Sequence, residues 1–79
     1  MARVLLFGRL ADQAGWRERI VEASSLAALR DLLEIEDAAL GEALAGPGVQ
    51  VAVDKVIVRG EAFLAAGAEV AFLPPMSGG

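Results

Sequence analysis

The sequence contains no cysteine and no histidine. Without cysteine, a disulfide framework and a thiol nucleophile are excluded. The absence of histidine as well removes the usual zinc ligands and the commonest general base. This composition argues against a hydrolase or a metalloenzyme that works by itself.

Clusters of basic residues and long apolar runs are also missing. Lysine and arginine total 7 against 11 aspartate and glutamate residues, so the formal net charge is −4. The electrostatic footprint of a nucleic-acid binder is therefore absent. The apolar run after Arg3 is too short for a signal peptide, and no stretch approaches the roughly 18 apolar residues of a membrane-spanning helix. We expect a cytoplasmic protein that binds neither nucleic acid nor membranes.

The chain has room for only one small core. It has 79 residues, of which 56% are hydrophobic. A domain of this size buries only about 60% of the surface that its unfolded chain exposes. One small core cannot bury all the side chains of so apolar a chain, so we expect some apolar surface to remain exposed. Exposed apolar patches commonly mark an interface.

Several segments have the composition of β-strands. The first is apolar throughout Val4–Phe7, which favours a central strand. A polar, glycine-containing stretch at 10–16 separates it from the next strand at 17–23, and we interpret the pair as a hairpin. The remaining strands are predicted at 49–53, 56–58 and 69–73, with Asp54-Lys55 as the turn of a second hairpin and Gly67 in a turn before the last strand.

Two segments have helical periodicity. Ser24-Ser25 precede LAALRDLLEI (26–35), where leucines recur at helical spacing and a serine hydroxyl can accept a hydrogen bond from a free backbone N–H of the first turn. EDAALGEALA (36–45) predicts a short helix that ends at Gly46-Pro47-Gly48. The predicted order is ββα, a short helix, a hairpin and a last strand.

The alternation of side chains predicts which face of the first and last strands is buried. Val4 and Leu6 share a wholly apolar face, as do Val70 and Phe72, and we assign both faces to the core. The opposite faces contain charged residues and a set of apolar ones: Leu5, Phe7, Leu73 and, depending on strand register, Ile57. These apolar residues form either a minor core under a loop or a surface for a partner, and we favour the partner surface.

The sequence ends with LPPMSGG. Pro74 and Pro75 stop the last strand, because proline has no donor for the β-ladder and its ring fixes φ. We expect the remaining residues to project from the domain as a tail: Met76, Ser77, Gly78 and Gly79. Without a Cβ, the two glycines can pass through a narrow channel into the active site of another protein.

The chemical group at the tip of this tail is the α-carboxylate of Gly79. A carboxylate is a poor acyl donor until its oxygen becomes a leaving group, which adenylylation by ATP achieves. If the incoming nucleophile then delivers sulfide, the product is a terminal thiocarboxylate. By this route a small protein becomes a sulfur carrier without a cysteine of its own.

Most of the chain resembles the small subunit of molybdopterin synthase, a ubiquitin-like β-grasp sulfur carrier. VAFLPPMSGG (70–79) is the most specific part of the resemblance. VLLFGRLADQAG (4–15) is similar to the opening strand and loop of that family, and LAALRDLL (26–33) is similar to its helix. The resemblance implies an α+β fold, in which a mixed sheet of about five strands packs on one main helix, with a second short helix. It also implies a β-grasp domain at 1–75 and a projecting tail at 76–79.

The resemblance further implies how Gly79 is used. A ubiquitin-activating-like adenylyltransferase consumes ATP to adenylylate the tail, and a sulfur donor protein converts the adenylate to a thiocarboxylate on Gly79, which follows Gly78. The tail then enters the large subunit, which binds cyclic pyranopterin monophosphate and supplies the catalytic side chains. This chain is then a noncatalytic subunit of a sulfurtransferase that binds no metal or cofactor itself. Phe7, Ile57 and Leu73 match the subunit interface.

Other functions use the same tail. A protein modifier would form isopeptide bonds through Gly79, although Lys55, the only lysine, excludes branched chains of the protein through several sites. A thiamine-pathway sulfur carrier would also end in two glycines, and the two prolines favour molybdopterin synthase over it. A simple interaction module would bind a partner through the sheet and leave the tail inert.

Overall fold

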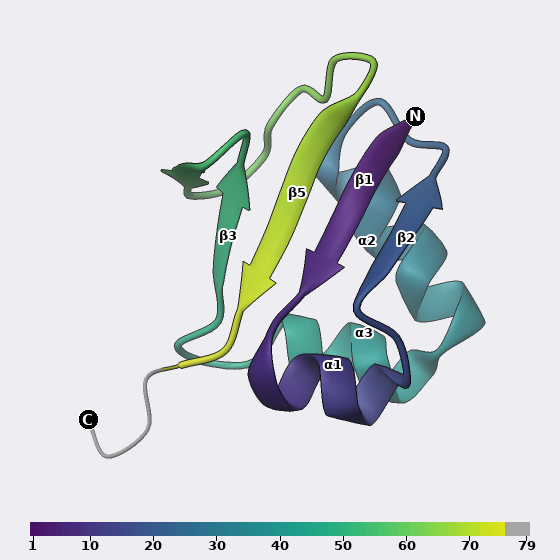
Figure 1. The fold of residues 1–79 in the computed structure, drawn as a ribbon, viewed down its shortest axis with the longest axis vertical. Helices are drawn as coiled ribbons and strands as arrows, with labels where there is room; N and C mark the ends of the chain where they lie inside the picture. The colour runs from purple at the N-terminus through teal and green to yellow at the C-terminus, as the bar shows by residue number, and fades with distance from the viewer. Residues whose placement is uncertain (76–79) are drawn as a thin grey trace.

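The computed structural model describes residues 1–75. Figure 1 shows how the elements of this part of the chain are arranged. In chain order they are β1 (Ala2–Leu6), α1 (Gly8–Ala14), β2 (Glu18–Val21), α2 (Leu26–Glu36), α3 (Ala38–Leu44), β3 (Gln50–Val53), β4 (Val56–Val58) and β5 (Ala68–Leu73).

The strands form one mixed sheet in the order β2-β1-β5-β3-β4. The two central strands, β1 and β5, are parallel, whereas every other neighbouring pair is antiparallel. The prediction of a central first strand is confirmed, and its physical reason is that both faces of Val4–Leu6 are apolar. With helices packed on the sheet, the fold is the predicted α+β β-grasp.

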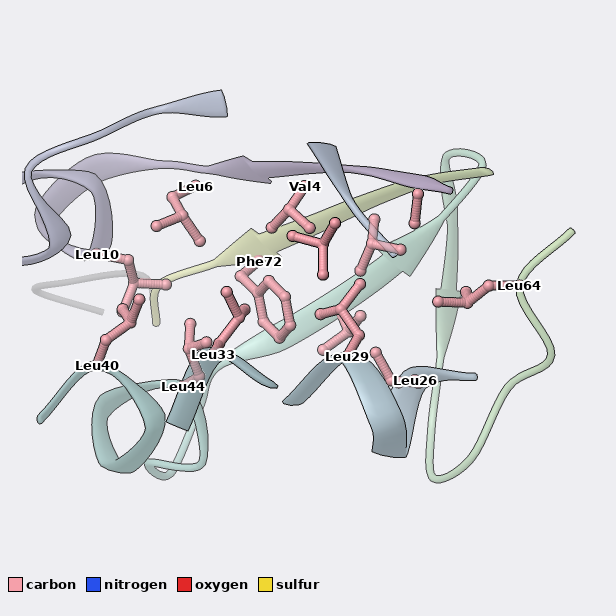
Figure 2. Close-up of a cluster of buried hydrophobic side chains, with 14 of the residues drawn as sticks. Val4, Leu6, Leu10, Leu26, Leu29, Leu33, Leu40, Leu44, Leu64 and Phe72 are labelled. Carbon is pink, nitrogen blue, oxygen red and sulfur yellow. The ribbon is translucent and has the colours of Figure 1, made fainter. Parts of the chain in front are cut away.

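The core lies between the sheet and the helices. Figure 1 shows α2 and α3 behind the sheet, and Figure 2 shows their side chains meeting those of the central strands. Val4, Leu6, Val70 and Phe72 are all buried on this side, which confirms the predicted core face of β1 and β5. From the helices the buried partners are Leu26, Leu29, Leu33, Leu40 and Leu44.

Side-chain caps fix where the two helices behind the sheet begin. The Oγ of Ser25 accepts a hydrogen bond from the backbone N–H of Ala28 at 3.1 Å, so the predicted cap of α2 is confirmed. The Oδ1 of Asp37 accepts one from the N–H of Leu40 at 3.1 Å and starts α3 in the same way. Each cap satisfies a backbone donor that would otherwise lack a partner in the first helical turn.

The stretch at 10–16, which the sequence predicted as a hairpin turn, belongs largely to a third helix, α1. The two strands that it joins are antiparallel neighbours, as predicted, but a helix connects them. Leu10 and Ala11 are buried in the core, and Gln13 Nε2 donates a hydrogen bond to the carbonyl oxygen of Ala39 at 3.1 Å. A helix of two turns has little stability of its own, and packing against α3 stabilises it here.

The predicted hairpin at Asp54-Lys55 is confirmed. Both residues have positive φ, +49° and +71°, and the strands on either side pair in antiparallel register from Val53 and Val56. Positive φ at both central positions is the geometry of the two-residue turn whose twist matches that of the flanking strands. The pairing partner of every residue in β4 is thereby set.

Candidate functional site

The open face of the sheet is the face opposite the helices. In Figure 1 it is turned toward the viewer, and no helix of the described chain covers it. One row of residues crosses it through successive strand pairs: Leu5 pairs with Ala71, Ala71 with Ala52, and Ala52 with Ile57. The register therefore places Ile57 on the same face as Leu5, a question that the alternation of the sequence left undecided.

Phe7 and Leu73 extend the apolar part of the open face toward the end of β5. Phe7 has an extended backbone just after β1, and its N–H donates a hydrogen bond to the carbonyl oxygen of Phe72 at 3.3 Å. Phe7 and Ile57 are 43% and 45% exposed, so no loop among residues 1–75 covers them. This exposure favours a partner surface over a minor core, whereas partner binding itself stays a prediction.

The other end of the open face is charged. Arg3 lies between two carboxylates: its Nε is 3.2 Å from an oxygen of Glu18 on β2, and its Nη2 is 3.3 Å from an oxygen of Glu69 on β5. Ion pairs this exposed contribute about 0–1 kcal/mol each to stability. The charged residues of the open face thus lie toward the start of β5, where the exposed Ile20 pairs with Arg3. The part of the face beside the end of β5 is apolar and holds Leu5, Phe7 and Leu73.

The base of the predicted tail begins where β5 ends at Leu73. Leu73, Pro74 and Pro75 are half-buried, so the prolines remain in contact with the domain. Pro74 follows the last ladder residue, Leu73, and Pro75 comes next, so the strand ends at the prolines as predicted. The predicted tail residues Met76, Ser77, Gly78 and Gly79 lie outside the described residues.

Two carboxylates with a lowered pKa lie at the ends of α2: Glu36 is its last residue, and Glu61 comes from the segment after β4. A hydrogen bond from the Arg19 side chain lowers the pKa of Glu36 at the C-terminus of α2. Hydrogen bonds from the backbone N–H groups of Ala62 and Ala27 lower the pKa of Glu61. These interactions hold the ends of a helix and involve none of the residues on the open face.

The described residues provide an apolar surface and the segment to which the predicted tail is joined. Within residues 1–75, every helix is too short or too polar to span a bilayer. That part of the chain also contains no group of three or more carboxylates placed to hold a metal ion. The arrangement places an apolar face, on which Phe7 and Ile57 are exposed, next to the segment from which residues 76–79 continue.

Two residues at the tail base were not among the predicted site residues. Gly8 lies against Pro74, and Gly48 lies against Pro75. For Gly48, the sequence predicts the local structure, because Gly46-Pro47-Gly48 is typical of a turn. Its contact with Pro75 depends on the pairing of β3 with β5 and was not visible in the sequence.

Comparisons with known proteins extend across the whole chain. The model of the ThiS family matches residues 4–79. Among solved structures, SAMP1 from Haloferax volcanii superposes with a TM-score of 0.86 and 28% sequence identity, covering 99% of this chain and 98% of that one. A search of curated proteins found no match.

Proposed function

The chain belongs to the ThiS family of β-grasp sulfur carriers, and from this premise we propose that it is the sulfur carrier subunit of a molybdopterin synthase. The supporting observation is the position of the tail base. β5, a central strand, leads into Pro74-Pro75 beside the apolar half of the open face, and the family match continues through Gly79. A partner that docks on this face therefore lies next to the point where the tail begins.

In the proposed reaction the reactive group is the carboxylate of Gly79. An adenylyltransferase joins this carboxylate to AMP and releases pyrophosphate from ATP. Sulfide from a donor protein then attacks the acyl carbon, so that the bond to AMP breaks as the C–S bond forms and the thiocarboxylate results. In the large subunit the sulfur forms a C–S bond to cyclic pyranopterin monophosphate as a C–O bond of that substrate breaks. Water then cleaves the bond between the sulfur and the acyl carbon, which leaves the sulfur on the pterin and returns the carboxylate of Gly79. Two loaded carriers supply the two sulfurs of the dithiolene.

The division of labour agrees with the composition of the chain. With neither cysteine nor histidine, the protein contributes the acyl group and the docking surface, while the large subunit contributes the catalytic side chains. The Pro-Pro pair before the terminal residues supports molybdopterin synthase over a thiamine-pathway carrier. We place the protein, its activating enzyme and its sulfur donor in the cytoplasm.

Phe7→Arg is expected to weaken binding to the large subunit by at least roughly 5- to 150-fold. Burial of an unpaired neutral polar group costs about 1–3 kcal/mol and burial of a charge costs more, whereas the Arg side chain stays hydrated in the free protein. Because Phe7 is 43% exposed, the free energy of unfolding should change by no more than about 0.5 kcal/mol. Isothermal titration calorimetry and urea denaturation measure the two effects.

Phe63→Arg is the matched control for this variant. Phe63 is 78% exposed but lies between β4 and β5, where it bridges to Ser25 at the start of α2. The same change of residue there should leave the affinity for the large subunit unaltered. Equal loss of binding in the two variants would show that the open face has no special role. If the Phe7→Arg protein unfolds and the Phe63→Arg protein does not, Phe7 contributes to the core.

Intact mass spectrometry of the untagged protein from its native cells tests the proposed function. We expect a fraction that is heavier by the replacement of one oxygen with sulfur, located at Gly79 and absent from cells that lack the activating enzyme. Loss of molybdoenzyme activity without a thiamine requirement, when the gene for this chain is deleted, assigns the pathway. Gly79 recovered in amide linkage to lysines of other proteins would instead identify a modifier.

A further inference from the structure

The base of the tail lies between two turns that are far apart in the sequence. One is the junction of β1 with α1 at Phe7-Gly8, and the other is the 46–48 turn that precedes β3. β5 pairs with both strands, parallel to β1 and antiparallel to β3, with Leu73 opposite Gln50. The chain therefore leaves β5 with one of these turns on each side.

Gly48 makes the tighter of the two contacts with the prolines. A Cβ built on Gly48 would lie 2.7 Å from the Cβ of Pro75 and 3.4 Å from its Cγ. The first distance is shorter than two non-bonded carbons can approach. Gly48 also has a φ of +83°, which L-residues with a side chain rarely adopt. Both the turn and the position of the Pro75 ring therefore require glycine.

Gly8 makes the corresponding contact on the other side. A Cβ built on it would lie 3.0 Å from the Cγ of Pro74, and its φ is +55°. The two glycines thus leave room for two consecutive proline rings. Each proline ring also fixes φ of its own residue at about −65°, so the path of the backbone is restricted at both Pro74 and Pro75.

We propose that Gly8 and Gly48 are positioning residues, which hold Pro74 and Pro75 and so set the point and direction from which residues 76–79 leave the domain. This inference rests on the proposed function, because its purpose is to bring Gly79 to the reacting atoms of partner enzymes. A misplacement of about 1 Å can reduce a reaction rate by about 100-fold. Docking of the open face and delivery of the tail are then separate properties, and these glycines govern the second.

Gly48→Ala and Gly60→Ala form a matched pair of variants. Gly60 has a φ of +81°, close to that of Gly48, so alanine introduces similar backbone strain at both sites. A Cβ at Gly60 would have no neighbour within 4 Å. Any effect that Gly48→Ala shows beyond Gly60→Ala therefore reports the contact with Pro75.

The first readout needs no partner. The chain has no native cysteine, so Ser77→Cys gives a single site for a nitroxide label. We expect the pattern of paramagnetic broadening over the domain amides to change when Gly48→Ala is added and to stay the same when Gly60→Ala is added. Identical patterns in all three proteins would overturn the proposal.

The second readout is ATP–pyrophosphate exchange by the adenylyltransferase, with the unlabelled variants as substrate. For Gly48→Ala we expect kcat to fall by about 10- to 100-fold while KM for the carrier stays the same, because the open face is intact. Partial unfolding alone would raise the apparent KM and leave kcat unchanged. Exchange supported equally well by Gly48→Ala and Gly60→Ala would refute the positioning role.

Pro75→Gly supplies a rescue test, because it removes the atoms that a Cβ at position 48 would meet. In that background Gly48→Ala should cost no more activity than Gly60→Ala does. An equal loss from Gly48→Ala with and without Pro75 would overturn the contact as the cause. Failure of the wild-type chain to support exchange would contradict the proposed function itself, whereas normal exchange by both wild type and Gly48→Ala contradicts only the positioning role.

Discussion

A chain that lacks Gly79 is expected to fold normally and to lose its ability to accept sulfur. Its terminal carboxylate would belong to Gly78 and would stop about 3.5 Å short of the position that the full-length tail reaches. Because a misplacement of only about 1 Å can reduce a rate by about 100-fold, thiocarboxylate formation should fall by at least on the order of 100-fold. Mass spectrometry after incubation with ATP, the activating enzyme and the sulfur donor measures this loss.

Ser77→Ala is the control for the deletion, because it alters the tail without changing its length or its last residue. It should be loaded at close to the wild-type rate. The deletion should leave the thermal unfolding midpoint unchanged, since Gly79 lies beyond the last strand and beyond the prolines that end it. Normal synthesis of molybdopterin by the shortened chain would refute the proposed role of Gly79.

Phe72→Ala is expected to remove a large part of the stability of the domain. Phe72 is fully buried in β5, the strand that pairs with both β1 and β3, and the Arg30 guanidinium carbon lies 5.3 Å from the centre of its ring. Replacing a buried phenylalanine with alanine costs about 3–5 kcal/mol. At about 0.05–0.15 kcal/mol per residue, a domain of this length has only about 4–12 kcal/mol in total. Urea denaturation followed by circular dichroism measures the change.

Phe63→Ala makes the same change of residue outside the core. Because Phe63 is 78% exposed, the free energy of unfolding should fall by less than about 0.5 kcal/mol. A similar small effect at Phe72 would mean that the cavity is refilled by its neighbours and that the core does not depend on this ring. The comparison separates the contribution of burial from that of the aromatic side chain itself.

These predictions assign different properties to different parts of a small chain. They assign the stability of the fold to Phe72, the proposed docking surface to Phe7, the proposed placement of the tail to Gly48 and the proposed reacting group to Gly79. The first three residues lie in the described domain, whereas the predicted role of Gly79 depends on partner proteins. A variant that loses sulfur loading can therefore be assigned to one of these causes by measuring stability, partner affinity and kcat together.

Local patterns in the sequence were sufficient for much of the fold. The alternation of Val4 and Leu6, and of Val70 and Phe72, identified the core face because successive side chains of a strand point to opposite sides of a sheet. Ser25 was recognisable as a helix cap because its hydroxyl acts within one turn of its own position. The terminal glycines and the prolines before them could also be recognised in the sequence, because the effect of each on the backbone is local to its own residue.

Only the tertiary structure decided the features that depend on residues distant in the chain. α1 was missed because its two turns depend on burial of Leu10 and Ala11 and on contact with α3. The face of Ile57 required the register of β3 with β4 and with β5, which sequence alternation alone leaves undecided by one residue. The contact of Gly48 with Pro75 joins two turns through the pairing of β3 with β5. The sequence by itself thus determined every element except α1, the buried faces of the central strands and the chemical identity of the last residues. The packing of distant segments decided where Pro74 and Pro75 lie and which surface lies beside them.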